Sequence, residues 1–284
     1  MNRRSLLKAG ISVSVSPWNW FPEASGQTSR TNVPAPRSDG WVSLLNGGNL
    51  DGWYTMLEKS GKGVAEQRKM VVIEQGMLHI MGNEVGQDTA EPGYISTLQE
   101  FENVHIRMEY KWGVKRFFPR SMAKRDNGIL YGLVGPDKVW STCAEFQIEE
   151  NDVGDAYLVS GIRGVQSEHG NGIFGQGLES GGWSQSYLDA QKKRNVSTRE
   201  PVGGRMIKDG DFENLNDWNL VEVIWQGDRA AHIVNGRTVN VITSLQQPNP
   251  QKAGEYIPLS KGKIAIEIEF AEIWFRRIEI KSLV

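Results

Sequence analysis

Apolar and polar residues alternate with a period of two along much of the chain, which is typical of half-buried β-strands. Residues 104–112 place five large apolar side chains on one face and four polar or charged side chains on the other. Residues 262–270 and 272–281 continue in the same style. The apolar phase shifts within the last segment, so we expect a bulge or a strand end near Arg276-Arg277. These segments predict sheets with one face in a hydrophobic core.

The pattern between the strands predicts turns and one long loop. Asn235-Gly236 lies between two β-prone runs and predicts a two-residue hairpin, because both central positions of such a turn need positive φ. The best helical periodicity, at residues 184–194, is short and polar. Residues 161–212 are rich in glycine, serine and charge and predict a long loop, which is either a cover over a site or a surface insertion. Many strands with few helices indicate an all-β sandwich or barrel.

The bulk composition narrows the classes of function. The chain has 284 residues, a size that one all-β domain can reach. Its net charge of −2 gives no electrostatic basis for binding nucleic acid, and no apolar run approaches the roughly 20 residues of a membrane-spanning helix. The single cysteine, Cys143, excludes an internal disulfide and a multi-cysteine zinc site, and no basic neighbour in the sequence activates it. We therefore expect Cys143 to be a small buried residue.

The first 39 residues suggest a targeting signal and a linker. Adjacent arginines at positions 3 and 4, followed by Ser-Leu-Leu-Lys, resemble a twin-arginine export signal, and small residues near position 25 suit a cleavage site. We interpret residues 1–26 as a signal peptide, 27–39 as a linker and 40–284 as a domain located in the periplasm or outside the cell. The alternative is a mildly basic N-terminus with no targeting role.

The densest group of candidate site residues lies at 144–152. A strand there turns three polar side chains to one face, about 6–7 Å apart at neighbouring positions: Glu145, Gln147 and Glu149. The apolar residues between them then face the core. Such a row can hydrogen-bond sugar hydroxyls, hold a hard cation or supply a general base. The alternative is the solvated outer face that antiparallel sheets commonly have.

A second predicted strand repeats this arrangement. Glu267 and Glu269 lie opposite the apolar face of residues 262–270. If both rows meet on one face, their like charges raise some carboxyl pKa values, as a general base requires. His232, just before the expected hairpin turn, is a candidate for orienting substrate or carrying a proton, although a lone histidine is more often structural. The sequence contains no zinc-binding spacing, phosphate-binding loop or Gly-x-Ser-x-Gly motif.

Five segments of the chain follow a known order of motifs. The first reads G-W-V-S-L-L-N-G-G-N-L-D-G-W at residues 40–53, and the third reads E-F-Q-I at 145–148. The last reads G-K-I-A-I-E-I-E-F-A-E-I-W-F-R-R-I at 262–278. The second is the strand pair at 94–110, and the fourth is the stretch at 218–236. In this order the segments resemble the motifs of the 3-keto-disaccharide hydrolase family, and they span nearly the whole expected domain.

The resemblance implies a fold and an activity. The fold is all-β, a concanavalin-like jelly-roll β-sandwich of two antiparallel sheets with a carbohydrate site on the concave sheet. The activity is the cleavage of glycosides whose C3 hydroxyl has been oxidised to a ketone. The chain departs from the family after D-N-G-I at residues 126–129, where an aromatic residue and arginine are usual, and it has Glu267 where glutamine is common and Phe270 where glycine is common.

The implied reaction assigns roles to the candidate residues. The C3 ketone acidifies the proton on C2, a carboxylate removes that proton, the enolate expels the C1 substituent, and water then adds. The base is expected to be Glu145 or Glu149, with His232 transferring a proton or positioning the substrate. Hydrogen bonds or a divalent cation would stabilise the enolate oxygen. Substrate contacts are expected from Gln147, Glu269, Asn127, Trp140 and Trp183.

Three alternatives to this enzyme stay open. A non-catalytic carbohydrate-binding module on the same sandwich would bind sugar without turnover. A retaining endoglucanase would need two carboxylates about 5–5.5 Å apart. Such enzymes typically carry them on a Glu-x-Asp-x-x-Glu strand, and Glu145, Gln147 and Glu150 match this spacing with glutamine in place of aspartate. A purely structural or partner-binding sandwich is the third alternative.

Overall fold

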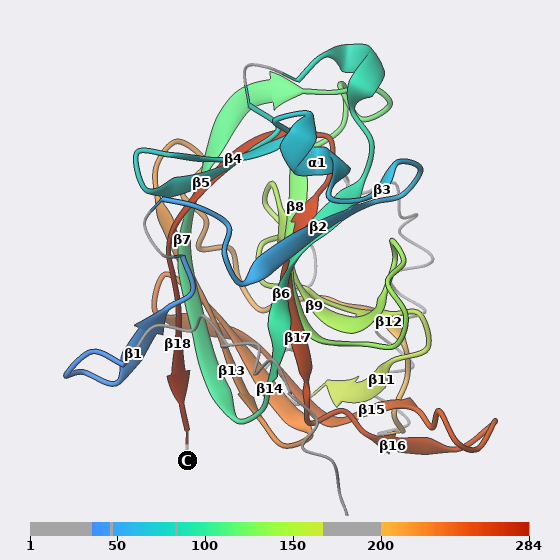
Figure 1. Ribbon diagram of the computed structural model, residues 1–284. Coiled ribbons are helices and arrows are strands. Elements are labelled where there is room, and N and C mark those ends of the chain that lie inside the picture. Colours follow the sequence, from blue (N-terminus) through green and yellow to red (C-terminus); the bar gives the residue numbers. More distant parts are fainter. Residues whose placement is uncertain (1–35, 46–47, 83–84, 167–199, 284) are drawn as a thin grey trace, which may run out of the picture. The chain divides into compact units, whose positions relative to one another are not determined.

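The structure is a computed structural model that describes residues 36–45, 48–82, 85–166 and 200–283. These residues form two antiparallel β-sheets packed face to face (Figure 1). The described helices are short and lie in connections: α1 (Val64–Gln67) and the 3-10 helix η1 (Gln87–Thr89). In this part of the chain no helix has the length and apolar character needed to cross a membrane.

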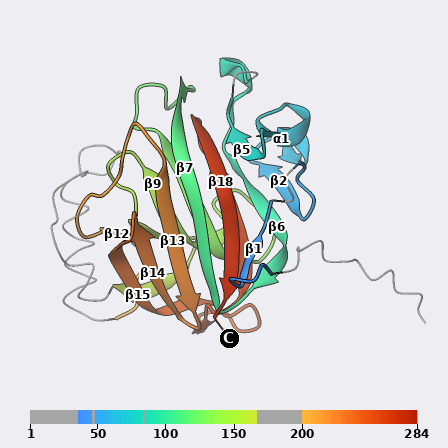
Figure 2. The same ribbon diagram turned by 90° about the vertical axis from the view of Figure 1, so that its left-hand side faces the viewer.

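The larger sheet, called sheet A, has ten strands and forms the front layer in Figure 2. Eight strands follow the order β11-β15-β14-β13-β7-β18-β5-β4, while β1 pairs with β18 and β16 pairs with β15. Their bounds are β1 (Trp41–Ser43), β4 (Val71–Glu74), β5 (Met77–Ile80), β7 (Val104–Arg116), β11 (Arg163–Gln166), β13 (Asn219–Gln226), β14 (Arg229–Val234), β15 (Arg237–Pro248), β16 (Tyr256–Pro258) and β18 (Ala271–Ser282).

The smaller sheet, called sheet B, has eight strands in the order β12-β10-β9-β8-β17-β6-β2-β3. Their bounds are β2 (Trp53–Leu57), β3 (Gly61–Lys62), β6 (Gly93–Phe101), β8 (Asp126–Val134), β9 (Thr142–Glu149), β10 (Ala156–Val159), β12 (Gly204–Met206) and β17 (Gly262–Ile268).

The hydrophobic core lies between the two sheets and consists of the apolar halves of the alternating strands. On β7 the side chains of Ile106 and Met108 are fully buried, and on β9 those of Phe146 and Ile148 are fully buried. Burying one such side chain contributes about 1.5–3 kcal/mol. The predicted jelly-roll sandwich of two antiparallel sheets is confirmed.

Two local expectations are also confirmed. Asn235 and Gly236 join β14 to β15 with φ angles of 48° and 78°. The register of β18 against β7 shifts between Arg276 and Glu279, and Arg277 within this bulge has a φ of 53°.

The expectation of an unbroken loop over residues 161–212 is wrong at both ends. β11 pairs with β15, and β12 pairs with β10. These strands have four and three residues and lie at sheet edges, so they offer too few alternating positions for recognition from sequence. The segment with the best helical periodicity, residues 184–194, lies outside the described residues.

The N-terminal assignments fall mostly outside the described residues. The expected signal peptide, residues 1–26, and the expected linker as far as residue 35 are not part of the description. Residues 36–39 form a turn before β1, in which the backbone N–H of Gly40 donates to the carbonyl of Arg37 at 2.8 Å. Arg37 forms ion pairs with Asp39 and with Glu279 of β18, so this turn is attached to sheet A.

The strand order of sheet B determines where the candidate residues lie. β8 runs between β9 and β17, so the acidic rows of β9 and β17 flank a single strand. In the register of β8 with β9, Glu149 lies opposite Asp126 and Gln147 lies opposite Gly128. The row of β9 is turned away from sheet A, because the alternate residues of this strand fill the core.

Candidate functional site

A pocket of about 260 Å³ lies on the outer face of sheet B. This volume is just below the roughly 300–1,000 Å³ of sites for drug-sized ligands, so it suits a smaller ligand such as one sugar ring. Trp140, Tyr157 and Val159 form part of its wall. The rest of the wall carries four carboxyl groups, one amide and two guanidinium groups, which belong to Asp126, Glu145, Glu149, Glu269, Gln147, Arg120 and Arg205.

The two acidic rows meet because the strand between them has a glycine at the crossing point. A Cβ atom on Gly128 would lie 2.6 Å from Oε1 of Glu145 and 2.8 Å from Oε2 of Glu267, closer than real Cβ contacts allow. Any larger residue at this position would push the two carboxyl groups away. Gly128 therefore lets side chains from β9 and β17 approach each other above β8.

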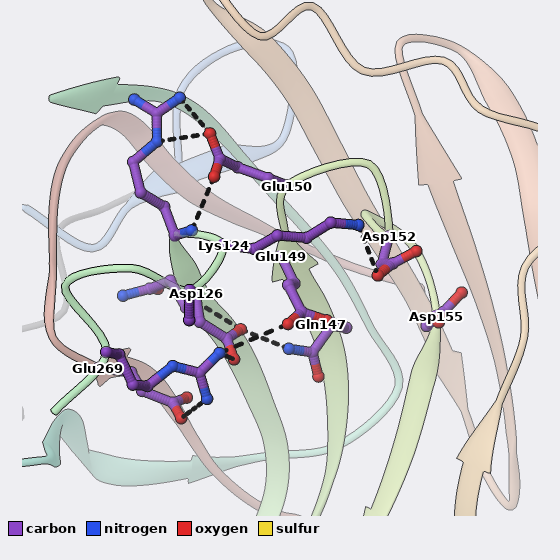
Figure 3. Close-up of polar contacts among 12 residues, drawn as sticks. Lys124, Asp126, Gln147, Glu149, Glu150, Asp152, Asp155 and Glu269 are labelled. Carbon is purple, nitrogen blue, oxygen red and sulfur yellow. Dashed lines mark hydrogen bonds and ion pairs between the residues drawn. The ribbon is translucent and has the colours of Figure 1, made fainter. Parts of the chain in front are cut away.

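Arg120 joins three carboxyl groups at one end of the pocket. It lies in the connection between β7 and β8, and its Nη2 atom is 2.6 Å from Oδ2 of Asp126. The same guanidinium group pairs with Glu269 at 3.1 Å and with Glu149 at 3.4 Å. The amide of Gln147 donates to Oδ1 of Asp126 at 2.5 Å, and Figure 3 shows these side chains turned toward one another.

Arg205 supports the other side of Glu149. Its Nη2 atom lies 3.1 Å from Oε2 of Glu149 and 3.2 Å from Asp152, and its Nε–H donates to Asp155 at 2.7 Å. Asp155 also accepts the backbone N–H of Lys208 at 2.8 Å. Arg205 comes from the edge strand β12 and is almost fully buried, so these contacts fix both its position and that of Glu149.

Burial shifts the acid–base properties of the carboxyl groups. It raises the pKa of Glu145 and Glu267 well above the usual range, and the neighbouring carboxyl groups raise these values further. Burial and the neighbouring carboxyl group of Glu267 raise the pKa of Glu269 to about 8. Burial also raises the pKa of Glu149, but Arg205 and Arg120 oppose the increase.

Among the carboxyl groups that line the pocket, Asp126 accepts the most hydrogen bonds from the described residues. Burial and the charge of Glu269 raise its pKa. Three donors nevertheless point at its oxygens: the guanidinium of Arg120, the amide of Gln147 and the backbone N–H of Asn127. These donors oppose the effect of burial and offset part of the cost of ionising Asp126.

The structure brings together five of the residues selected from sequence. Glu145, Gln147, Glu149 and Glu269 line the pocket with Trp140. Trp140 is 48% exposed and has a φ of 60°, an uncommon backbone conformation for a large residue. The other tryptophan proposed for substrate contact, Trp183, lies outside the described residues.

His232 and Asn127 do not reach the pocket, which corrects their expected roles. His232 is fully buried between the sheets, where its ring nitrogens lie 3.1 Å from the hydroxyl of Tyr131 and 3.1 Å from the carbonyl of Gly154. Burial lowers its pKa to about 4, so the ring is neutral near pH 7. Asn127 falls on the core side of β8, where its amide donates to the carbonyl of Glu267 at 2.6 Å.

Sequence reasoning did not select Arg120, Arg205 or Asp126 for the site. The two arginines come from a connection and from a three-residue edge strand, neither of which has a periodic pattern. The sequence does contain a sign that Asp126 belongs to the site. Asp126 lies two residues before Gly128 and therefore on the same face of the strand. That signal becomes informative only when the pairing of β8 between β9 and β17 is known.

Local contacts bear on two other expectations, the endoglucanase spacing and the burial of the single cysteine. Glu150 lies away from the pocket wall, where it binds Arg125 and Arg116, so the endoglucanase spacing does not place its carboxylates on one face. Cys143 is buried as expected, and burial raises the pKa of its thiol well above the usual value.

Positive charge in the pocket comes from guanidinium groups. Within the described residues no group of three or more histidine, cysteine, aspartate or glutamate side chains is arranged to hold a metal ion. Each arginine of the pocket instead contacts three carboxyl groups.

Fold and pocket together define a concanavalin-like jelly-roll protein with an acidic site on one sheet. The model of the 3-keto-alpha-glucoside-1,2-lyase-like domain family matches residues 40–281, and the chain belongs to this family. The family resemblance read from the sequence is therefore confirmed, and it gives the protein a carbohydrate-related function.

Solved structures resemble this chain in fold. A proposed glycosyl hydrolase from Parabacteroides distasonis is 17% identical, with 87% of this chain and 95% of that chain covered and a TM-score of 0.50. A second proposed glycosyl hydrolase from the same organism is 16% identical, with 86% and 99% covered and a TM-score of 0.46. A β-glucanase from Bacillus licheniformis is 10% identical, with 86% and 97% covered and a TM-score of 0.43. A search of curated proteins finds no significant match.

Proposed function

We propose that this pocket cleaves the glycosidic bond of 3-keto-glycosides by removing the proton on C2 and eliminating the C1 substituent, after which water adds. The observation that carries the proposal is that Glu145 and Glu149 of β9 lie in one pocket, with the guanidinium groups of Arg120 and Arg205 beside Glu149. Such a site offers a proton acceptor, a proton donor and fixed positive charge within one sugar-sized hollow. Membership of the family supports the same chemistry.

Glu149 is the base in this proposal. Its two oxygens face Arg120 and Arg205, which favour its ionised form, while burial makes that carboxylate more basic than one in water. The C3 ketone acidifies the neighbouring C2–H, so a carboxylate of this strength can remove the proton. The negative charge then develops on the ketone oxygen, within the field of the guanidinium groups.

Glu145 is the proton donor to the leaving oxygen. The structure records no ion pair between its side chain and an arginine or lysine among the described residues, and burial raises the pKa of Glu145, which favours its protonated form. When Glu145 gives its proton to the C1 oxygen, the C1–O bond breaks and a C1=C2 double bond forms. Water then adds its hydroxyl to C1 while its proton returns to Glu145, and Glu149 returns its proton to C2.

The remaining polar and aromatic groups bind and orient the sugar. Gln147 and Glu269 can hydrogen-bond hydroxyl groups from opposite sides of the pocket. Trp140 offers a half-exposed aromatic face for stacking on a ring. Arg120 supplies guanidinium donors near the ketone oxygen, where they stabilise the enolate.

The direct test compares Glu149→Gln and Glu145→Gln with the wild-type protein on 3-ketotrehalose. Each variant should lose roughly 10²- to 10⁴-fold in kcat with little change in KM, because each removes one proton-transfer group. Glu102→Gln is the matched control, since Glu102 is exposed and lies outside the pocket.

Product analysis and isothermal titration separate the enzyme from a binding module. Wild-type rates in both pocket variants would remove the proposed base and acid. Binding of the ketoglycoside without any product from the wild-type protein would support a carbohydrate-binding module instead.

A further inference from the structure

Glu267 is a buried acidic residue that the proposed reaction does not use. It lies on β17, it is only 6% exposed, and it is not part of the pocket wall that holds the proposed base. Its carboxyl group meets that of Glu145 above Gly128. Glu267 instead lines a small cavity beside the pocket, together with Trp140 and Glu269.

The hydrogen bonds of Glu267 are incomplete if it is ionised. Its Oε2 atom is buried, and among the described residues no N–H or O–H group donates to it. Oε2 is also the atom that faces Oε1 of Glu145 across the space left by Gly128. Buried polar atoms are nearly always hydrogen-bonded, so a proton on Oε2 that is donated to Glu145 resolves the deficit.

The charges around the pair favour a neutral Glu267. The guanidinium groups of the pocket are engaged by other carboxyl groups, since Arg120 pairs with Asp126, Glu149 and Glu269, and Arg205 pairs with Glu149, Asp152 and Asp155. The titratable groups that face Glu145 and Glu267 are Asp126, Arg205, Glu269 and Cys143, together with Tyr157 opposite Glu145 on β10 and Tyr94 opposite Glu267 on β6. Two ionised carboxylates here would repel each other without a directly bound cation.

We propose that Glu267 is a permanently protonated positioning residue, and that its Oε2–H group donates a hydrogen bond to Glu145. The inference rests on the proposed function, in which Glu145 donates a proton to the leaving oxygen. When that proton departs, the new carboxylate of Glu145 already has a hydrogen-bond donor. The stabilised carboxylate makes Glu145 a stronger acid than it would be beside an apolar residue.

No proton is gained or lost by Glu267 in the cycle. The proton on Glu145 moves to the leaving oxygen, the proton on C2 moves to Glu149, and both positions are refilled when water adds. Glu267 keeps its own proton throughout, and only the strength of its hydrogen bond to Glu145 changes. A neutral amide has the same shape and can donate in the same place, which gives the proposal a sharp test.

Two substitutions at position 267 separate a neutral donor from an ionised group. Glu267→Gln preserves a donor to Glu145, so kcat on 3-ketotrehalose and the pH at which activity falls on the alkaline side should stay close to wild type. Glu267→Leu removes the donor, so kcat should fall by roughly tenfold or more with little change in KM, and the alkaline fall should move to higher pH. If Glu267→Gln instead moves the alkaline fall to lower pH, Glu267 was ionised and the proposal is wrong.

An infrared measurement at pH 7 without substrate tests the protonation state independently of turnover. The difference between wild-type protein and Glu267→Gln should contain one band of a protonated carboxyl group and none of a carboxylate. Loss of a carboxylate band would overturn the inference. If the wild-type protein fails to convert the ketoglycoside, the proposed function fails, while the infrared result still decides the state of Glu267.

Gly128→Ala provides a second way to separate the pair. The added Cβ atom contacts the ends of two side chains rather than the backbone, so the fold can adjust while the carboxyl groups move apart. We expect a loss of kcat similar to that of Glu267→Leu. Gly86→Ala is the control, because its Cβ atom would meet only Oγ1 of Thr89 at an ordinary distance of 3.5 Å. Wild-type kcat in Gly128→Ala would show that the contact is irrelevant to the reaction.

Discussion

Glu269 shows at the scale of one residue how burial changes the charge of the pocket. Burial and the nearby Glu267 raise its pKa from 4.5 to about 8, although Arg120 favours the ionised form. Because the folded state holds this proton more tightly than the unfolded chain does, Glu269 stabilises the fold most below pH 4.5. That contribution is lost as the pH rises toward 8, since Glu269 must then ionise in a buried position or stay protonated at a cost.

The thermal stability of Glu269→Gln should therefore depend less on pH than that of the wild-type protein. Between pH 5 and pH 8 the wild-type Tm should fall further than the Tm of the variant, because the amide cannot ionise. Each kcal/mol of difference corresponds to about 2–4 °C in a protein of this size class. Thermal unfolding at both pH values measures the effect, with Glu102→Gln as an exposed control. Parallel falls of Tm in wild type and Glu269→Gln would contradict the raised pKa.

Periodicity identifies single residues only when they belong to long strands. Alternation alone is enough to place Glu145, Gln147 and Glu149 on one face, because residues 144–149 of β9 follow it without a break. The same reasoning could not tell that His232 faces the core, since both faces of a short strand carry mixed residues. The two guanidinium groups were missed because Arg120 lies in a connection and Arg205 lies on a three-residue edge strand, and neither segment has a periodic pattern.

At the scale of elements, the connection between β8 and β9 carries Trp140 to the pocket. Residues 135–141 lie beside the outer face of sheet B, and Asp137 attaches them there. Its Oδ1 atom accepts the hydroxyl of Tyr54 at 2.5 Å, and its Oδ2 atom lies 3.2 Å from Nζ of Lys62. The contacts of Asp137 therefore determine where Trp140 stands relative to the pocket.

Asp137→Asn should weaken substrate binding more than it slows the reaction. Loss of the charge weakens the attachment to Tyr54 and Lys62, so Trp140 becomes less well placed for stacking, while the carboxyl groups on β9 are unchanged. Half-exposed ion pairs contribute about 1 kcal/mol or less, so we expect a rise in KM of roughly two- to fivefold with kcat nearly constant. Steady-state kinetics on 3-ketotrehalose measure both quantities.

Asp228→Asn is the control for this experiment, because Asp228 lies in the turn between β13 and β14 and away from the pocket wall. A fall in kcat with unchanged KM in Asp137→Asn would argue against a role through Trp140.

The hairpin of β14 and β15 and the bulge at Arg277 were predictable because they depend on local turn chemistry and phase. The meeting of β9 and β17 across β8 was not, because it depends on pairing between distant segments.

At the scale of the whole molecule, the pocket exists only in the folded sandwich. Its wall draws on positions from Arg120 to Glu269, which come from β8, β9, β10, β12 and the connections beside them. Sheet A contributes no residue to this wall and supports sheet B through the shared core. Composition and alternation predicted the class of fold, while the order of strands that creates the pocket required long-range contacts that no local pattern encodes.

The location proposed for the protein gives a further prediction at this scale. We propose export by the twin-arginine route, on the basis of the adjacent arginines at positions 3 and 4 and the small residues near position 25. Replacing both arginines by lysine keeps the charge but removes the planar guanidinium groups. Full-length precursor should then stay in the cytoplasm and no shortened form should reach the periplasm, as judged by cell fractionation and the mass of the product. Lys8→Arg is the charge-matched control, and equal export of the double-lysine variant would show that the N-terminus does not use this route.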